Sequence, residues 1–314
     1  MAHRPRILVL LNPSSGVSIA HPSAERIRTL FRSHPVDATV VETVSVDDAY
    51  QRSRRAADEG YDRVVAAGGD GTIHTVIRGV LDGDQQVRIG ILPIGSGNVL
   101  ATELGLSWYL PRAVRTVVEG AVRSLDVAYL PDRQTYSFLS VATGYGARIV
   151  MDVPKDLKRV LGGGIYFLTA IRNMFRLRRS RVTIAADGVL YRRSADVVFI
   201  TNTNVVWTRS LYKPDIGVRL DDGKFDLFIV RKANLYGWLI FVLSLLFPRY
   251  GRDPRVTHLQ ASRIVLHAYP DAPVQVDGEP AGQTPLTMEI LRRAVRVIVR
   301  SNSAEKGIAE TRES

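Results

Sequence analysis

The sequence predicts an α/β domain followed by an antiparallel β domain. In the first half, short apolar strands alternate with helices, which is the pattern of a parallel sheet covered on both faces. In the second half, strands predominate, and Asp-Gly pairs at 187–188, 222–223 and 277–278 mark tight turns. We therefore expect a doubly wound parallel sheet over residues 1–124, an antiparallel β-sandwich over 125–300, and a polar tail over 301–314 that could pack back on the first domain.

The elements of the first half follow from local patterns. The apolar run Arg6–Leu11 is too short for the apolar region of a signal peptide and is followed by Asn-Pro, so it is interpreted as a buried strand. Ser45 or Asp47 is the expected N-cap of the second helix, because either side chain can accept from first-turn N–H groups. The expected helices are Ser23–Phe31, Asp47–Glu59 and Ile73–Val80, and the further strands are Asp37–Thr43, Arg63–Ala67 and Arg88–Leu92.

The pattern changes near Arg123. The apolar stretch Trp238–Phe247 is far shorter than the roughly 20 residues of a membrane-spanning helix, so it cannot span. It is either a core helix or a helix lying in a membrane interface, for which Trp238 at one end and Arg249 beyond the other are suited. The expected strands are Ser124–Tyr129, Tyr136–Val141, Arg181–Ala186, Val197–Thr201, Phe225–Val230, Ile264–His267 and Val274–Val276, interrupted by helices at Ile165–Leu177 and Leu235–Phe247.

Composition narrows the classes of function. The chain of 314 residues has no cysteine, which excludes disulfides, cysteine-bound zinc and thiol catalysis. Its formal net charge of +11 favours an anionic partner. Residues 1–125 hold 14 basic and 13 acidic residues, whereas residues 126–314 hold 28 and 18, and seven of those basic residues lie between 172 and 193. The excess positive charge of the second half forms either a solvated basic face or a surface that approaches a membrane.

Three loops follow strands of the first half: Asn-Pro-Ser-Ser-Gly at 12–16, Gly-Gly-Asp-Gly-Thr at 68–72 and Pro-Ile-Gly-Ser-Gly-Asn at 93–98. Parallel strands place all three at one edge of the sheet, and glycines let backbone N–H groups turn toward a phosphate. The helix expected near Ile73 adds the positive end of its dipole. Asp70 has no cationic neighbour in the sequence, and a carboxylate beside phosphates is best explained by Mg²⁺ between them. The loops predict a nucleotide-binding domain that has neither a P-loop nor a dinucleotide fingerprint.

The ordered set of loops resembles the catalytic domain of the diacylglycerol kinases, a family that includes sphingosine, ceramide and bacterial lipid kinases and is similar to NAD kinases. The resemblance extends over about residues 6–300, and its later points are Gly144-Tyr145-Gly146, Lys158 to Tyr166, Leu220-Asp221-Asp222-Gly223 and Val276-Asp277-Gly278-Glu279. It implies a first domain that binds ATP and a β domain that binds the lipid.

The resemblance also implies roles for individual residues. Asp70 would contact the nucleotide and hold the active-site Mg²⁺, and Glu279 would lie near both. Asp277 would be the base that phosphoryl transfer requires, and it would take the proton of the lipid hydroxyl. The pair Asp277-Gly278 is also typical of a hairpin turn, so a turn alone is the alternative. Asp221 and Asp222 would hold a second, structural Mg²⁺. The remaining nucleotide contacts would be Asn12, Gly68, Gly69, Gly71, Thr72, Gly95, Ser96, Gly97 and Asn98.

The chain departs from the family pattern in three places. His74-Thr75 stand where many members have Asn-Glu, which removes a carboxylate. Arg148 stands where a Gly-x-Gly-x-Asp-Ala pattern would place Asp, which reverses a charge. Trp207-Thr208-Arg209-Ser210 replaces a stretch that is often rich in glycine. These departures bear on the identity of the lipid and on activity itself.

We therefore expect an ATP- and Mg²⁺-dependent lipid kinase that phosphorylates a hydroxyl of a diacylglycerol-like lipid, in the cytoplasm and peripheral at the inner membrane face. Two alternatives stay open: a kinase for a soluble substrate such as NAD, and a non-catalytic relative that binds nucleotide or lipid. The expected partners are the lipid and an anionic membrane surface. Nucleic acid is not expected, since no binding motif with interleaved aromatic residues is present. The sequence leaves open which lipid is used and whether the chain is a monomer or a homodimer.

Overall fold

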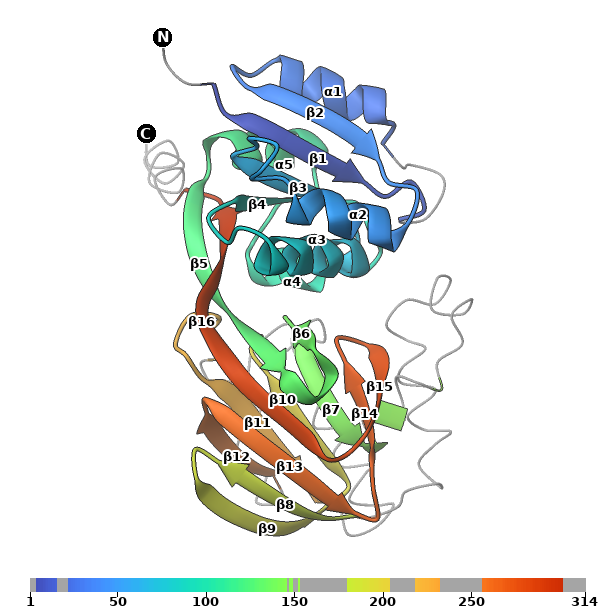
Figure 1. Cartoon of the computed structure of the whole chain (residues 1–314), viewed down its shortest axis with the longest axis vertical. Helices are drawn as coiled ribbons and strands as arrows, with labels where there is room; N and C mark the ends of the chain where they lie inside the picture. The colour runs from blue at the N-terminus through green and yellow to red at the C-terminus, as the bar shows by residue number, and fades with distance from the viewer. Residues whose placement is uncertain are drawn as a thin grey trace, which may run out of the picture. The chain divides into compact units, whose positions relative to one another are not determined.

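The computed structural model describes residues 4–15, 22–145, 147–148, 152, 180–203, 218–231 and 256–301. The chain forms two compact units, one of residues 1–125 with 293–314 and the other of residues 126–292 (Figure 1). The first unit therefore includes the C-terminal part of the chain, because the end of the last strand pairs within its sheet. The helices expected at Ile165–Leu177 and Leu235–Phe247, with the stretch Trp238–Phe247, lie outside the described residues, as does the tail after Ser301.

The first unit is built on a parallel sheet in the order β2-β1-β3-β4. The end of β16 (Leu286–Val299) runs parallel to β4, with Val297 opposite Ile89. Strands β3 and β4 are apolar and buried along almost their whole length, as a sheet covered on both faces requires. The four strands are β1 (Arg6–Leu11), β2 (Asp37–Glu42), β3 (Arg63–Gly68) and β4 (Arg88–Pro93).

The helices of this unit bury amphipathic faces against the sheet. In α1 and α5, side chains at helical spacing such as Ile27 and Val114 join Val9 and Val65 of the strands in one apolar cluster. Helices α2 and α3 pack on each other, with Gly79 of α3 against Ser53 of α2. The helices are α1 (Ala24–Arg32), α2 (Val46–Arg54), α3 (Asp70–Asp82), α4 (Val99–Glu103) and α5 (Leu110–Glu119).

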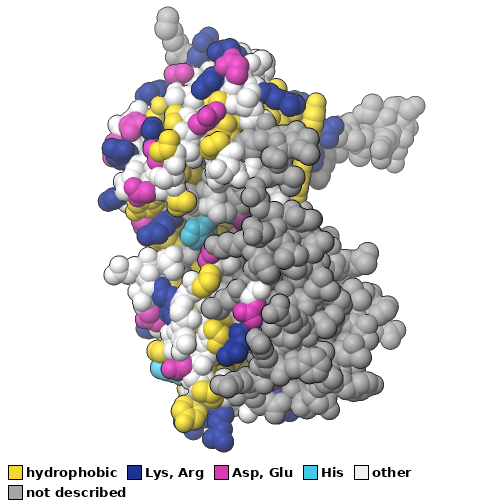
Figure 2. Space-filling view, turned by 90° about the vertical axis from the view of Figure 1, so that its right-hand side faces the viewer, with side chains coloured by type: hydrophobic (Ala, Val, Ile, Leu, Met, Phe, Trp, Pro, Cys, Tyr) yellow, Lys and Arg dark blue, Asp and Glu magenta, His cyan; other side chains and the backbone are white. Residues whose placement is uncertain are grey.

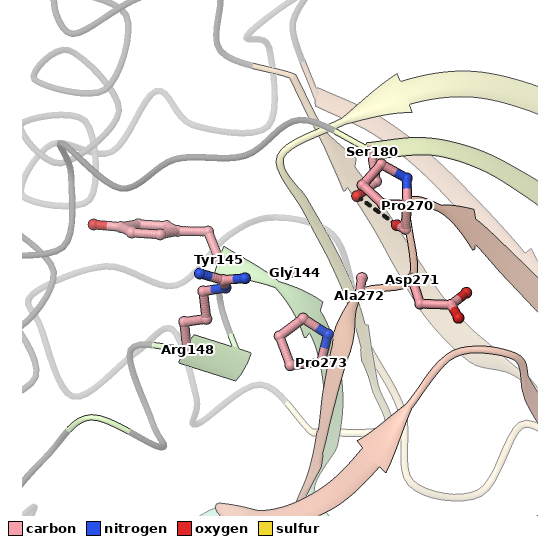
Figure 3. A pocket seen from close by; sticks show the side chains of 8 residues that line it. All are labelled: Gly144, Tyr145, Arg148, Ser180, Pro270, Asp271, Ala272 and Pro273. Carbon is pink, nitrogen blue, oxygen red and sulfur yellow. Dashed lines mark hydrogen bonds between the residues drawn. The ribbon is translucent and has the colours of Figure 1, made fainter.

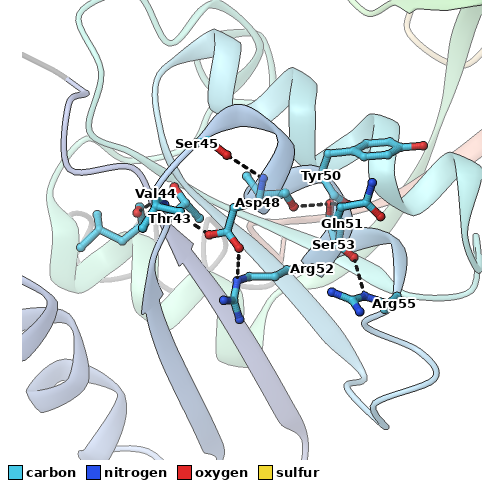
Figure 4. A network of polar contacts seen from close by, with 11 residues as sticks. Thr43, Val44, Ser45, Asp48, Tyr50, Gln51, Arg52, Ser53 and Arg55 are labelled. Carbon is cyan, nitrogen blue, oxygen red and sulfur yellow. Dashed lines mark hydrogen bonds and ion pairs between the residues drawn. The ribbon is translucent and has the colours of Figure 1, made fainter.

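Helix α2 illustrates how the sequence starts a helix. Its N-cap is Ser45, whose side chain accepts from the Asp48 N–H at 3.0 Å. Asp48 in turn accepts from the Val44 N–H at 3.2 Å and pairs with Arg52 at 2.7 Å (Figure 4). Of the two N-caps considered from the sequence, the structure uses Ser45, and the helix ends at Arg54 rather than Glu59.

The second unit packs two antiparallel sheets on one apolar core, as the sequence predicted. One sheet has the order β12-β11-β10-β7-β14-β15, and the other contains β16, β13, β8 and β9 in this order. Ile184 and Leu266 of one sheet and Leu227 and Ile229 of the other lie in the same buried cluster. The bounds are β6 (Thr135–Ser137), β7 (Ser140–Gly144), β8 (Ser180–Ala186), β9 (Val189–Ala195), β10 (Val197–Thr201), β11 (Phe225–Val230), β12 (Val256–Ala261), β13 (Arg263–Tyr269), β14 (Pro273–Val276) and β15 (Glu279–Gln283).

Some predicted elements differ from the structure. The expected strand Tyr136–Val141 is two strands, β6 and β7, because a carboxylate accepts the N–H groups of the residues between them. The strand expected at Ser124–Tyr129 is longer, β5 (Ala121–Leu130), and a single 3₁₀ turn, η1 (Pro131–Arg133), follows it. Helix α3 begins at Asp70, three residues before the predicted start, because Gly69 is its N-cap.

Candidate functional site

The three predicted loops meet in the first unit. Strands β1, β3 and β4 are parallel and adjacent, so the segments that follow them emerge at the same edge of the sheet. Backbone bonds then join the loops, with the Asn12 N–H donating to the Ala67 carbonyl at 3.0 Å and the Ile94 N–H to the Gly68 carbonyl at 3.2 Å. Gly16 lies outside the described residues, so the first loop is described through Ser15.

Side chains hold the first loop to the second. The Asn12 side-chain amide donates to Thr72 Oγ1 at 3.0 Å, while its oxygen accepts from the Ser14 N–H at 3.0 Å. Ser15 Oγ lies 3.4 Å from Thr72 Oγ1 and accepts from the Gly69 N–H at 3.4 Å. Asn12 and Thr72 therefore position the backbone of the glycine loop.

The second and third loops are joined through Asp70 and two glycines. Asp70 Oδ1 accepts from the Val99 N–H at 2.6 Å, which caps the start of α4. A Cβ at Gly95 would collide with the Gly69 backbone, and a Cβ at Gly97 would collide with the Asp70 carboxylate. Glycine at 95 is thus required by the close approach of the two loops, independently of any ligand, whereas a side chain at 97 would displace the Asp70 carboxylate.

Asn98 closes the third loop on itself. It is fully buried, has a φ of 52°, and exchanges two hydrogen bonds with Gly95, accepting from the N–H at 3.1 Å and donating to the carbonyl at 2.7 Å. Asparagine tolerates this left-handed conformation better than most residues do. The side chain is thus part of the framework of the loop.

Burial divides the predicted nucleotide residues into two groups. Gly68, Thr72 and Asn98 are buried and hold the framework. The residues that reach the surface are Gly71 and Ser96, which are exposed, and Asn12, Gly69, Asp70, Gly95 and Gly97, which are half-buried. Among the predicted nucleotide residues, a ligand at this edge would therefore meet glycine backbone, the Ser96 hydroxyl and the Asp70 carboxylate, and it would also meet Ser14 and Ser15 of the first loop.

The exposed group of atoms is suited to an anion with a bound cation. Helix α3 starts at this edge, and its N-cap Gly69 has no side chain to satisfy the first-turn N–H groups. Within the described residues, no three His, Asp or Glu side chains converge on a metal position. Mg²⁺ commonly uses only one or two carboxylates together with phosphate oxygens and water. Asp70, half-buried where the three loops meet, fits that pattern.

Asp277 lies in the second unit, in the hairpin turn between β14 and β15. Its φ of 48° and the Gly278 φ of 90° confirm the turn that the Asp-Gly pair predicted. The carboxylate has a second role, because it accepts four hydrogen bonds from the segment that separates β6 from β7. Oδ1 accepts from the Ser137 hydroxyl at 2.7 Å and from two N–H groups, those of Leu139 at 3.0 Å and Ser140 at 2.9 Å. Oδ2 accepts from the Phe138 N–H at 2.8 Å. Two residues further on, Glu279 is exposed at the start of β15.

The predicted second metal site at Asp221 and Asp222 has few converging oxygens. Asp221 pairs with Arg219 at 3.4 Å, and Asp222 accepts from the Lys224 N–H at 3.0 Å. The Arg292 guanidinium lies directly against Gly223. Two arginines, Arg219 and Arg292, thus lie at the turn, and no three His, Asp or Glu side chains of the described residues converge there. A second Mg²⁺ at this turn stays a prediction from the resemblance.

Asp126 of β5 bonds to this turn, and the sequence analysis missed it. It is 4% exposed, and its carboxylate accepts from the Gly223 N–H at 2.6 Å. A single acid within the apolar strand Leu125 to Leu130 was the available signal, since a buried carboxylate requires donors. Asp126 therefore joins this turn to β5 through its carboxylate and its N–H group.

The structure describes two of the three departures from the family pattern, those at His74-Thr75 and at Arg148. Thr75 is 9% exposed, and its hydroxyl donates to the Gly71 carbonyl at 2.9 Å in the first turn of α3. His74 is half-buried on the same turn. Residues Trp207 to Ser210 lie outside the described residues.

Arg148 lines a pocket of about 70 Å³ in the second unit, together with Tyr145, Ser180 and the segment 270–273. Figure 3 shows Tyr145 and Arg148 on one side, with the Asp271 carboxylate directed the opposite way. Burial raises the pKa of Tyr145 to about 12, so its hydroxyl stays neutral. The charge reversal at 148 therefore places a cation in a small pocket beside a neutral phenol.

Comparison with known proteins agrees with this architecture. Residues 6–130 match the model of the diacylglycerol kinase catalytic domain, and residues 139–299 match the YegS C-terminal NAD kinase beta sandwich-like domain. The chain is 29% identical to a diacylglycerol kinase of Bacillus subtilis over 303 residues, covering 96% of this chain and 98% of that protein. It is 26% identical to a diacylglycerol kinase of Staphylococcus saprophyticus, covering 98% and 99%.

A solved structure has the same fold. The crystal structure of a diacylglycerol kinase from Bacillus anthracis aligns with a TM-score of 0.76 and 22% identity, over 95% of this chain and 98% of that one. None of the helices that the structure describes is long and apolar enough to cross a membrane.

Proposed function

Because this chain belongs to the family that joins a diacylglycerol kinase catalytic domain to a YegS C-terminal NAD kinase beta sandwich-like domain, we propose that it is an ATP-dependent lipid kinase. The reaction is transfer of the γ-phosphoryl group to a hydroxyl of a diacylglycerol-like lipid. The observation that carries the proposal is that the three loops contact one another at one edge of the sheet, where the Gly71 backbone is exposed and the Asp70 carboxylate is half-buried.

In this reaction the hydroxyl oxygen of the lipid bonds to the γ-phosphorus of ATP, the bond to the β–γ bridging oxygen breaks, and ADP leaves. Phosphoryl transfer depends chiefly on positioning and on neutralising charge. The Gly71 N–H in the first turn of α3 would bind a phosphate oxygen, and the Ser96 hydroxyl would add a donor. Mg²⁺, when bound at Asp70, would neutralise phosphate charge.

Asp277 is the proposed acceptor of the hydroxyl proton. Its carboxylate is held by four donors in one orientation, which supports a positioned base. The same bonds support a purely structural role, so the role of Asp277 needs a measurement that separates activity from stability. Glu279 is proposed to lie near the nucleotide on the resemblance alone.

We place the enzyme at the cytoplasmic membrane surface as a peripheral protein, since its proposed substrate resides in the bilayer. The test is incubation with γ-labelled ATP, Mg²⁺ and a total lipid extract, followed by phase separation. Label in the organic phase supports the proposal. Label in the aqueous phase with NAD as acceptor would identify a soluble substrate instead, and ATP binding without turnover would identify a non-catalytic relative.

A further inference from the structure

The outer face of the sheet β16-β13-β8-β9 in the second unit carries basic and aromatic side chains next to one another. The inner face of these strands, including Val182, Ile184 and Leu266, lies in the apolar core. Side chains alternate along a strand, so the neighbours of these residues point away from the core. Two large residues on the outer side are strongly exposed, Leu190 by 53% and Tyr269 by 78%.

Strand register arranges the outer side chains in rows. Leu190 of β9 lies opposite Ala185 of β8, which lies opposite Val265 of β13. In the next row, Arg192 lies opposite Thr183, which lies opposite His267. In the third row, Arg181 of β8 lies opposite Tyr269 of β13. We call this set the outer basic face: Arg181, Thr183, Ala185, Leu190, Arg192, Val265, His267 and Tyr269.

The acids near the outer basic face are mostly engaged elsewhere. Glu289 pairs with Arg263 at 3.2 Å. Asp187, in the β8–β9 turn, accepts from the N–H and hydroxyl of Ser262 and from the Arg263 N–H, between 2.8 and 3.0 Å. Asp271 is exposed just beyond the end of β13. Among the described residues, neither Arg181 nor Arg192 makes an ion pair, so each guanidinium on this face keeps an unpaired positive charge.

We propose that the outer basic face docks the protein on an anionic lipid bilayer. The proposal rests on the proposed function, for which it identifies the membrane-facing surface. Arginines near an anionic bilayer gain electrostatic energy, and an exposed tyrosine and leucine suit the headgroup region. In Figure 2, yellow and dark blue side chains adjoin at the lower end of the second unit, where Figure 1 places β8 and β9.

Two other occupants fit the face less well. A second copy pairing along the edge strand β9 would bring Arg192 and Arg193 against their counterparts, and charges on an edge oppose such pairing. Nucleic acid would use the arginines but leave Leu190 exposed to solvent or phosphate. The apolar and aromatic members of the face therefore favour a bilayer.

The experiment is vesicle co-sedimentation of the full chain without nucleotide. Vesicles of phosphatidylcholine alone are compared with vesicles that also contain phosphatidylglycerol, at about 0.01 M and about 1 M salt. The test variants are the double substitution R181Q/R192Q and the single substitution Tyr269→Ser. The matched controls in the first unit are R26Q/R54Q, with the same loss of charge, and Tyr109→Ser, since Tyr109 is 62% exposed.

Wild type is expected to bind only the anionic vesicles and to be released at high salt. R181Q/R192Q should lower the partition coefficient about 30-fold, from about 1 kcal/mol for each basic residue. The control pair should lower it less than about threefold. Equal losses in test and control variants would overturn the assignment of this face, and so would binding that ignores lipid charge.

Two further outcomes would also overturn it. One is a smaller oligomer of R181Q/R192Q than of wild type by light scattering, which would show that the face is an interface between copies of the chain. The other is equally tight, R181Q/R192Q-sensitive binding of a DNA duplex at the same salt. Kinase activity is measured separately on detergent-dispersed lipid. Salt-sensitive docking by a protein that phosphorylates no lipid would reject the proposed function and leave the docking face in place.

Discussion

Replacing Asp277 by Asn tests whether this residue is a base or only a structural acceptor. The substitution keeps the side-chain shape and tolerates the φ of 48°. The amide oxygen can still accept from Ser137, Leu139 and Ser140, but the amide nitrogen faces the Phe138 N–H, which loses its acceptor. One hydrogen bond to a charged group is worth about 1.5–3 kcal/mol.

Stability and turnover then report separate roles. The loss of one such bond should lower the melting temperature of the second unit by about 3–12 °C, using roughly 2–4 °C per kcal/mol for this size. If Asp277 accepts the hydroxyl proton, kcat measured well below the melting temperature should fall by about 10²–10⁴. Ser137→Ala is the control, because it removes the 2.7 Å bond and leaves the carboxylate in place. It should destabilise by about 1.5–3 kcal/mol and change kcat by no more than a few-fold.

The assay is initial-rate phosphorylation of a detergent-dispersed lipid at saturating ATP, combined with thermal melting of each variant. A kcat of the Asp277→Asn variant within threefold of wild type, together with the expected fall in melting temperature, would refute the base. Asp277 would then serve only to fix the segment between β6 and β7.

Three further predictions address other residues. A Cβ at Gly71 meets nothing within 4 Å, so Gly71→Ala should keep the melting temperature. It should weaken ATP binding, measured by calorimetry, roughly 5- to 150-fold, as about 1–3 kcal/mol of overpacking against a ligand implies. The control is Gly79→Ala, whose Cβ meets Ser53; it should lower the melting temperature and leave ATP binding unchanged. Asp70→Asn keeps an acceptor for the Val99 N–H but loses the charge, so kcat should fall at least about 100-fold with a small change in melting temperature; unchanged kcat across a Mg²⁺ titration would make Asp70 a helix cap only. His258→Ala removes the imidazole that lies 2.6 Å from the fully buried Asp226 carboxylate and leaves the Gln260 amide at 3.1 Å as its described partner, which should cost about 1–3 kcal/mol in urea unfolding, with recovery in the double variant that adds Asp226→Asn.

The parallel sheet was predictable because each of its strands is a short apolar run. Strands β1, β3 and β4 are buried along their length, so periodicity and burial agree. Helix α5 was missed although its signals were present. Pro111 lies in its first turn, and Leu110, Ala113, Val114 and Val117 recur at helical spacing.

Four strands of the β domain were missed, β9, β12, β15 and β16, and for two of them the reason is physical. Strand β9 is an edge strand with Val189, Leu190, Arg192 and Arg193 all exposed, so it shows no alternation between apolar and polar residues. Strand β16 pairs with β13 at one end and with β4 at the other, and it is exposed at Arg292 and Arg293 between them. A change of partners within one strand interrupts the pattern that identifies strands.

The sequence predicted that the three loops meet, but it did not predict which of their residues hold the loops together and which can meet a ligand. Asn98 and Gly95 fit a motif that binds nucleotide, yet the structure joins them to each other by two hydrogen bonds and buries Asn98 completely. Asp70 is likewise engaged with the Val99 N–H while it remains half-buried at the edge. A motif reports which residues are needed at a site, whereas burial and partners decide which of them hold the loops and which can meet a ligand. Variants at Gly71 and Ser96, which are exposed, should therefore change ATP affinity at constant stability, and variants at Asn98 should change both together.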